Sequence, residues 1–185
     1  MDFRDSPKEE EFRAEARAFL EANAPEQPVD FFDDEADEEE LLERSLSWQK
    51  TLFEHGWAAV TWPREYGGRG QGPIEQIVWN QELARAGFGE TMFVVGIGMA
   101  GPTIIAHGSD EQKERFLKPL AQGQKLGAYC LSEPGAGTDA ANQQTMAKKD
   151  GDDWIINGMK NFITNGANAD TLIVFAQTDP ALKHK

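Results

Sequence analysis

Two short stretches in the second half of this 185-residue chain hold the residue types that could do chemistry. The first runs from Tyr129 to Asp139 (YCLSEPGAGTD) and combines two aliphatic hydroxyls, two carboxylates and two glycines. Gly135 and Gly137 have no Cβ, so backbone N–H groups near them can approach an anionic or polar ligand closely. The stretch therefore predicts a ligand-binding loop at the end of an apolar strand.

Residues 135–140 (GAGTDA) also match the dinucleotide-binding pattern G-x-G-x-x-A. That pattern has to open a helix inside a βαβ unit. Here the chain instead leads into Asp150-Gly151, which is typical of a hairpin turn. The sequence therefore disfavours a Rossmann site.

The second stretch covers residues 154–164 (WIINGMKNFIT). If it is extended, side-chain alternation puts Lys160, Phe162 and Thr164 on one face. An aromatic ring beside a hydroxyl could stack on a planar ligand and form hydrogen bonds with its edge. The alternative, on the residues alone, is a core Phe beside a Thr that favours strands.

Other kinds of site find little support in the sequence. His55 and His107 each precede a glycine that ends a predicted helix, where a ring interacts favourably with the helix dipole. No His, Cys or carboxylate spacing indicates a metal site, and none indicates an activated nucleophile. The single Cys130 excludes an internal disulfide, and no apolar run is long enough to span a membrane. We therefore expect a soluble cytoplasmic protein without a metal.

The net charge of −14 is concentrated in residues 1–50, which hold 17 acidic and 6 basic residues. This sign disfavours binding to the phosphate backbone of nucleic acid. Most of the excess falls in residues 30–40, which we interpret as a solvated linker because blocks of like charge stay extended. A docking site for a basic partner is the alternative.

Hydrophobic periodicity and capping residues predict that residues 1–124 are helical. The helices are expected from Ser6-Pro7 to Pro25, over 41–55, from Pro73 (with residues 74, 77, 78, 83 and 84 buried), over 91–107 with a kink at Pro102, and from Ser109. Small residues at positions 96, 98, 100 and 101 could leave room for a bulky ligand. They could equally let two backbones pack closely.

After Gly123 the periodicity becomes that of strands. Residues 127–132 and 170–177 are typical of buried strands, and Asp150-Gly151, Asn157-Gly158 and Asn165-Gly166 mark tight turns between them. We predict an α+β fold with an all-helical N-terminal domain, residues 1–124, followed by an incomplete antiparallel β-domain, residues 125–185.

Residues 129–139 and 157–165 resemble the two signature stretches of the acyl-CoA dehydrogenase family. The resemblance extends to the loop 62–68 (WPREYGG) and to the helix start at 109–116, and so covers nearly the whole chain. It implies the N-terminal helical domain and the first part of the middle, β-barrel-like domain, without the C-terminal helical domain.

The resemblance also implies an FAD site. Thr138 would additionally reach the CoA arm of the substrate, and Thr164 would form a hydrogen bond near the reactive nitrogen of the flavin. Phe162 stands where the family often has Trp, Ser132 where Thr is common and Thr138 where Ser is common. The implied cofactor-binding residues are Tyr129, Leu131, Ser132, Gly137, Thr138, Phe162, Ile163 and Thr164.

The implied activity is FAD-dependent α,β-dehydrogenation of an acyl-CoA thioester, in fatty-acid metabolism. No residue is assigned as the catalytic base, because Glu133 lies in the loop motif and not where the family keeps its base. We therefore expect the chain alone to be inactive. Expected partners are acyl-CoA, an electron-transfer flavoprotein as acceptor and further subunits of a homo- or hetero-oligomer, a dimer or tetramer. The alternatives are an acyl-CoA oxidase, a flavin monooxygenase, or a non-catalytic subunit or binding module completed by a partner chain.

Overall fold

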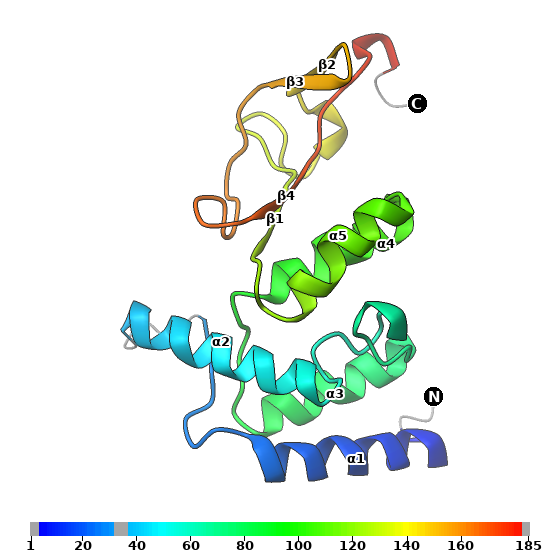
Figure 1. Cartoon of the computed structure of the whole chain (residues 1–185), viewed down its shortest axis with the longest axis vertical. Coiled ribbons are helices and arrows are strands. Elements are labelled where there is room, and N and C mark those ends of the chain that lie inside the picture. The colour runs from blue at the N-terminus through cyan, green and yellow to red at the C-terminus, as the bar shows by residue number, and fades with distance from the viewer. Residues whose placement is uncertain (1–3, 32–36, 183–185) are drawn as a thin grey trace. The chain divides into compact units, whose positions relative to one another are not determined.

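The computed structural model describes residues 4–31 and 37–182, and the chain divides after Lys125 into two compact units. The first unit is helical and the second contains the strands, which confirms the predicted α+β class. None of the helices in these residues is long and apolar enough to cross a membrane. The helices are α1 (Pro7–Asn23), α2 (Glu38–Glu54), α3 (Pro73–Arg85), α4 (Gly101–His107) and α5 (Asp110–Ala121), with a 3₁₀ turn η1 (Arg64–Tyr66) and a π-helical segment η2 (Gly96–Ala100) (Figure 1).

Two helices begin where the sequence predicts, at Ser6 and Ser109, and each start forms a capping box. The Ser6 Oγ accepts from the Glu9 N–H at 3.4 Å, while the Glu9 carboxylate accepts from the Ser6 N–H at 2.6 Å. At α5, Ser109 and Gln112 exchange the same two bonds at 3.2 and 2.8 Å. Each box satisfies two N–H groups that a helix start otherwise leaves unpaired.

Helix α2 begins earlier than predicted and takes up part of the acidic run. Asp37 is its N-cap, and the Asp37 carboxylate accepts from the N–H groups of Glu39 and Glu40 at 3.0 and 3.2 Å. Acidic side chains are favourable at the positive end of the helix dipole. The linker prediction is therefore wrong for residues 38–40, and residues 32–36 lie outside the described part.

Aromatic side chains form much of the core of the helical unit. Trp48 stacks on Phe88 with ring centroids 4.8 Å apart, and Trp57 stacks on Trp79 at 4.5 Å. Helix α1 lies beside α3 (Figure 1) and contributes Phe19 to this cluster. The predicted buried residues of α1 are all buried, namely Phe12, Ala16, Phe19 and Leu20.

The prediction for α3 is only partly correct. Val78 is buried, but Ile74 and Ile77 are about half exposed, at 50% and 51%. The inward face of α3 instead carries the buried carboxylates of Glu75 and Glu82, whose partners lie on α1. Hydrophobicity alone therefore assigned the wrong residues to this face.

The buried carboxylate of Glu82 ties α3 to α1. It accepts from the Arg13 Nη1 at 2.9 Å and from the Arg17 Nε at 2.6 Å, with the Glu82 side chain 3% exposed. The hydrogen bonds from Arg17 and then Arg13 outweigh burial and lower the pKa of Glu82. This pair of contacts is a buried ionic link within the helical unit.

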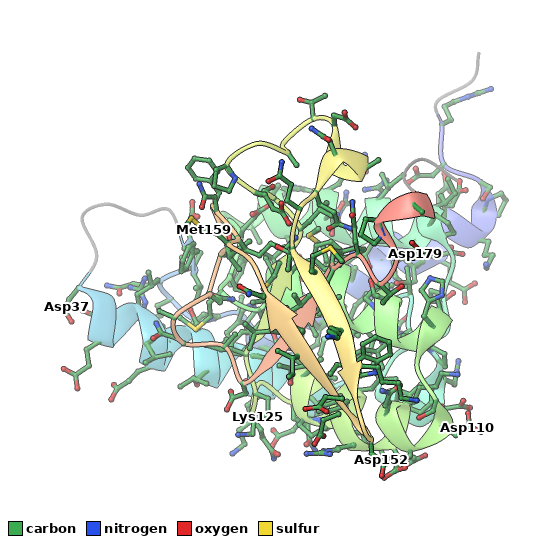
Figure 2. All side chains as sticks on the ribbon, turned by 90° about the horizontal axis from the view of Figure 1, so that it is seen from above. Asp37, Asp110, Lys125, Asp152, Met159 and Asp179 are labelled. Carbon is green, nitrogen blue, oxygen red and sulfur yellow. The ribbon has the colours of Figure 1, made fainter. Side chains whose placement is uncertain are left out.

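The second unit contains strands β1 (Gly127–Cys130), β2 (Met146–Asp150), β3 (Asp153–Asn157) and β4 (Thr171–Val174). β2 and β3 form an antiparallel hairpin around Gly151, as predicted, with Asp152 and Met159 toward its opposite ends (Figure 2). β1 and β4, however, are parallel, with Gly127 opposite Thr171. The prediction of an entirely antiparallel meander is therefore wrong for this pair. The intervening residues 131–170 are long enough for the crossover that a parallel pair needs.

Candidate functional site

The loop after β1 forms a tight turn with open space around its two glycines. The Glu133 N–H donates to the Ala136 carbonyl at 3.0 Å, and the Ala136 N–H donates back at 3.1 Å. A Cβ added at Gly135 or Gly137 would meet no atom within 4 Å, and neither glycine has a positive φ. The packing of the chain therefore gives no reason for glycine here, whereas close approach of a ligand would.

The carboxylate of Glu133 is buried at the base of this loop and surrounded by donors. Its side chain is 5% exposed, and it accepts from the Lys160 Nζ at 2.8 Å and from the N–H groups of Gln144 and Thr145 at 2.5 and 2.9 Å. Burial alone would raise the pKa of Glu133, but these donors outweigh burial and hold that pKa at about 2. Glu133 is therefore an ionised structural group at neutral pH.

Lys160 connects the two motif stretches. Its Nζ donates to the Leu131 carbonyl at 3.0 Å and to the Gln143 Oε1 at 3.3 Å, in addition to Glu133. The next residue, Asn161, donates its N–H to the Ser132 carbonyl at 2.9 Å. The structure thus brings Leu131 and Ser132 beside the segment that carries Phe162, Ile163 and Thr164.

The predicted strand over residues 159–164 is not formed, so the proposed common face of Lys160, Phe162 and Thr164 is wrong. β3 ends at Asn157, and Lys160 points inward to its acceptors while Phe162 is 96% exposed. Phe162 has a φ of +57°, which a strand cannot accommodate. The side-chain alternation expected of a strand therefore does not apply.

Gly158 explains why the chain leaves the strand at this point. A Cβ on Gly158 would lie 2.6 Å from the Thr145 Cα and 2.7 Å from the Thr145 Cβ. Thr145 is itself buried, at 2% exposure, and donates its N–H to Glu133. The close approach of Gly158 to Thr145 sets the path that leads Lys160 to the buried carboxylate.

Several polar groups of the two stretches have no protein partner. Within the described residues, the N–H groups of Ser132, Ile163 and Thr164 donate no hydrogen bond. The hydroxyls of Ser132, Thr138 and Thr164 likewise form none in this part of the chain. Thr138 and Thr164 are exposed, and no hydrogen bond joins Thr138 to residues 162–164 there.

Two residues of β1 are explained by packing. The Tyr129 ring lies against Phe175, with centroids 5.0 Å apart and planes at 57°. Cys130 is buried, and this burial raises the pKa of its thiol, so Cys130 is not an activated nucleophile. Of the sequence-derived site, Leu131, Ser132 and residues 162–164 are brought together, while Tyr129 contributes mainly to the strand packing.

The Glu133–Lys160 pair is the feature that sequence reasoning missed. Both residues lie inside motif stretches that are otherwise apolar or small, and their opposite charges are the signal that could have indicated it. Alternation instead placed Lys160 on the same face as Phe162. The error followed from the strand assignment.

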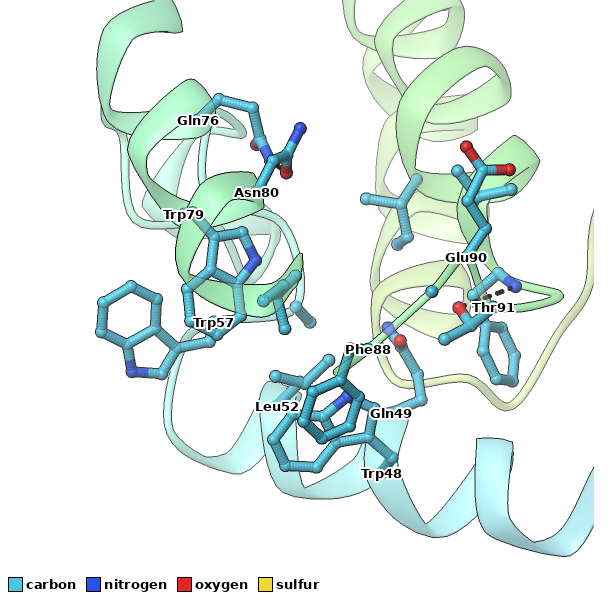
Figure 3. Close-up of a pocket in the computed structure, with 16 residues that line it drawn as sticks. Trp48, Gln49, Leu52, Trp57, Gln76, Trp79, Asn80, Phe88, Glu90 and Thr91 are labelled. Carbon is cyan, nitrogen blue, oxygen red and sulfur yellow. Dashed lines mark hydrogen bonds between the residues drawn. The ribbon is translucent and has the colours of Figure 1, made fainter. Parts of the chain in front are cut away.

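The helical unit contains a cavity of about 360 Å³. Figure 3 shows Trp79, Gln76 and Asn80 of α3 on one side and Glu90 and Thr91 on the other. Trp48, Leu52 and Phe88 line it as well. An aromatic wall with a few polar groups is typical of small-molecule pockets.

The small residues Gly98 and Gly101, which follow the cavity-lining residue Ile97 in the sequence, differ in their packing. A Cβ on Gly101 would overlap the indole of Trp62, whose Nε1 donates to the Ile97 carbonyl at 3.0 Å. A Cβ on Gly98 would meet nothing within 4 Å. Close packing therefore accounts for Gly101 but not for Gly98.

Within residues 4–31 and 37–182, the histidines and acidic residues form no cluster that could be a metal centre. The His55 Nδ1 lies 2.9 Å from the Thr51 carbonyl, which can only accept, so Nδ1 carries the proton and His55 caps α2. Among the residues described, no group of three or more His, Cys, Asp or Glu is placed to hold a metal ion.

Comparisons with known proteins agree with the motif resemblance. The profile "Acyl-CoA dehydrogenase, N-terminal domain" matches residues 6–124, and "Acyl-CoA dehydrogenase, middle domain" matches residues 128–185. The short-chain-specific acyl-CoA dehydrogenase of Clostridium acetobutylicum is 42% identical over 131 residues, which are 70% of this chain and 35% of that protein. Acyl-CoA dehydrogenase IpdE1 of Mycobacterium tuberculosis is 34% identical over 172 residues, 92% of this chain and 45% of that one.

Among solved structures, a chain of the ChsE4–ChsE5 complex from Mycobacterium tuberculosis is similar with a TM-score of 0.74 and 36% identity, over 98% of this chain and 45% of that chain. The chain thus spans less than half the length of these relatives. Two family profiles together cover nearly every residue, in the order expected for the fold. The chain belongs to the acyl-CoA dehydrogenase family.

Proposed function

We propose that this chain supplies one side of an FAD site in an enzyme that dehydrogenates acyl-CoA thioesters at the α,β position. The observation that carries the proposal is the set of partnerless N–H groups on Ser132, Ile163 and Thr164, on two segments held side by side by Lys160. Ser132 and Ile163 are half-buried and Thr164 is exposed, so these N–H groups are accessible to an acceptor that the described part of the chain does not supply. A planar ligand with acceptors on its edge, such as an isoalloxazine ring, would satisfy them.

The residues present fit a flavin in two further ways. The Phe162 ring is 96% exposed at a φ of +57°, a rare conformation for a bulky residue and one that clusters at functional sites. Stacking on a planar ring would use that exposed surface. The open space around Gly135 and Gly137 would let the cofactor or the CoA arm approach the backbone beside Thr138.

The division of labour follows from these positions. When bound, FAD would accept the β-hydrogen of the substrate as a hydride. Leu131, Ser132, Phe162, Ile163 and Thr164 would bind and orient the ring, and Thr138 would hold the CoA arm. Glu133 would stay ionised and hold Lys160, so it would not remove the α-proton.

We infer that a further polypeptide segment, outside the described residues, completes the FAD site. β3 is exposed along its whole length, with Trp154, Ile155 and Ile156 each more than half exposed. Side chains alternate along a strand, so these residues expose apolar surface on both faces of β3, and exposed apolar surface of this kind is typical of interaction sites. The similar ChsE4–ChsE5 structure is a complex, so a second subunit is one candidate for this cover.

The test compares the 185-residue chain with the assembly formed when the chain is co-expressed with a candidate partner subunit. FAD affinity would be measured by quenching of flavin fluorescence, and turnover by acyl-CoA-dependent reduction of an electron acceptor. We expect the isolated chain to bind FAD weakly or not at all and to show no turnover, and the assembly to do both. Robust turnover by the isolated chain would overturn the inference that the base lies elsewhere.

The electron acceptor separates the remaining alternatives. A dehydrogenase would reduce an electron-transfer flavoprotein, whereas an oxidase would reduce oxygen and release peroxide. A stable chain that recruits a partner without binding FAD would indicate a binding module.

A further inference from the structure

We propose that Glu133 and Lys160 are positioning residues: their buried ion pair fixes the 129–139 loop against the 157–165 segment and so sets the geometry of both flavin-facing segments. The inference rests on the FAD site proposed above and adds two residues that act through others. Neither residue is expected to touch the reacting atoms.

The pair is buried, and all three donors of the Lys160 ammonium have acceptors. The Lys160 Nζ lies 2.8 Å from the Glu133 Oε1, with side chains 11% and 5% exposed. An ammonium has three donors, and here the acceptors are Glu133, the Leu131 carbonyl and Gln143. The other bonds of Glu133 come from backbone N–H groups of residues 144 and 145, which lead into β2.

The two segments have little else to hold them together. Ladder pairing in the described part of this unit joins β1 to β4 and β2 to β3, and residues 131–139 and 158–165 lie outside both ladders. The backbone bond from Asn161 to Ser132 and the contacts of Lys160 join the segments directly. Lys160 also precedes Phe162 by two residues. Its contacts therefore restrict the position of the backbone from which the exposed Phe162 ring projects.

Stability alone explains such a pair poorly. Replacing a buried ion pair by apolar groups of similar volume is often neutral or stabilising, because desolvation offsets the attraction between the charges. In some proteins a buried charged pair instead selects one arrangement, because a partner left without its counter-charge is costly, and we propose that role here. Positioning of the two segments is the advantage that this geometry offers.

The first experiment needs no flavin. Hydrogen exchange would be followed at Asn161 and Thr145 in the 185-residue chain, comparing wild type with Lys160→Met. Glu82→Gln, which breaks a buried ionic link in the helical unit, is the matched control. We expect exchange about a hundredfold faster at both amides in Lys160→Met, because one partner of a buried pair is left uncompensated, and no change there in Glu82→Gln. Unchanged exchange in Lys160→Met would overturn the proposal, whether or not the wild type binds FAD.

The second experiment separates positioning from stability in the FAD-loaded assembly. The double variant Glu133→Gln/Lys160→Met leaves no lone buried charge and should regain the thermal stability lost by either single variant. Its FAD dissociation constant should nevertheless stay about tenfold or more above wild type, equivalent to about 1.4 kcal/mol, with an altered flavin absorbance spectrum. If the double variant recovers affinity and spectrum together with stability, the pair is merely structural and the proposal fails. If the wild-type assembly binds no FAD, the proposed function fails, and the exchange experiment alone decides the positioning.

Discussion

Adding one methyl group at Gly158 or at Gly137 should have opposite effects on the second unit. At Gly158 the new Cβ would lie 2.6 Å from the Thr145 Cα and 2.7 Å from its Cβ. Thr145 cannot withdraw easily, because its N–H donates to Glu133 at 2.9 Å and its carbonyl accepts from the Gln177 N–H at 2.8 Å. Overpacking against fixed backbone costs about 1–3 kcal/mol, and we expect Gly158→Ala to reach the upper half of that range.

At Gly137 the same methyl group meets no atom within 4 Å, and the backbone φ is not positive. Gly→Ala at such a position is neutral or stabilises by about 0.4–1 kcal/mol, because it restricts the unfolded chain. Gly137→Ala should therefore leave the unit as stable as wild type or more so, yet weaken FAD in the assembly if a ligand approaches there. The contrast between the two variants separates an effect on ligand binding from an effect on the stability of the fold.

The assay is urea unfolding followed by hydrogen exchange of peptides from residues 126–182, so that the helical unit does not contribute to the signal. Gly158→Ala should lower the free energy of unfolding of this unit by about 2–3 kcal/mol. If Gly158→Ala matches wild type within about 0.5 kcal/mol, or if Gly137→Ala is equally destabilising, the reasoning from Cβ positions is wrong.

Three further outcomes are expected. The pKa of Glu133 falls from 4.5 to about 2 on folding, so its contribution of about 3 kcal/mol is complete above pH 4.5 and lost as the pH falls towards 2; the free energy of unfolding of the second unit should therefore decrease over this pH range, and Glu133→Gln should remove this decrease. Gly101→Ala should destabilise the helical unit by about 1–3 kcal/mol by displacing the Trp62 indole, detectable as a lower melting temperature with altered near-UV circular dichroism. Thr138→Ala should leave the stability of the chain within about 0.5 kcal/mol of wild type, since Thr138 is exposed, but raise the KM for acyl-CoA in the assembly; an unchanged KM would remove Thr138 from the substrate site.

Local signals predicted the helical unit well because the forces involved are local. The helix starts at Ser6 and Ser109 depend on residues three positions apart, and both lie where the sequence predicts. The parallel pairing of β1 with β4 joins residues more than 40 positions apart, which no local pattern encodes. The motif resemblance identified the two segments of the candidate site, but their contacts depend on a backbone path that no periodicity describes.

The error at residues 159–164 has a specific physical origin. Alternation assumed that the strand continues beyond Asn157, whereas the close approach of Gly158 to Thr145 and the positive φ of Phe162 end it. The same departure turns Lys160 inward to Glu133 and Phe162 outward to solvent. The residues that broke the prediction are thus those that form the candidate site, as expected where function overrides local regularity.

The states of the buried carboxylates in the described residues indicate whether any of them could abstract the α-proton. They are Glu75, Glu82 and Glu133, and each bonds directly to a lysine or arginine that lowers its pKa. A general base works best with a pKa near the operating pH, and carboxylates reach such values by burial away from cations. All three are held in the opposite state, ionised and bonded to a cationic side chain. We therefore expect the base for the α-proton to come from a group outside this set, while the residues around Glu133 and Lys160 bind and orient the reacting partners.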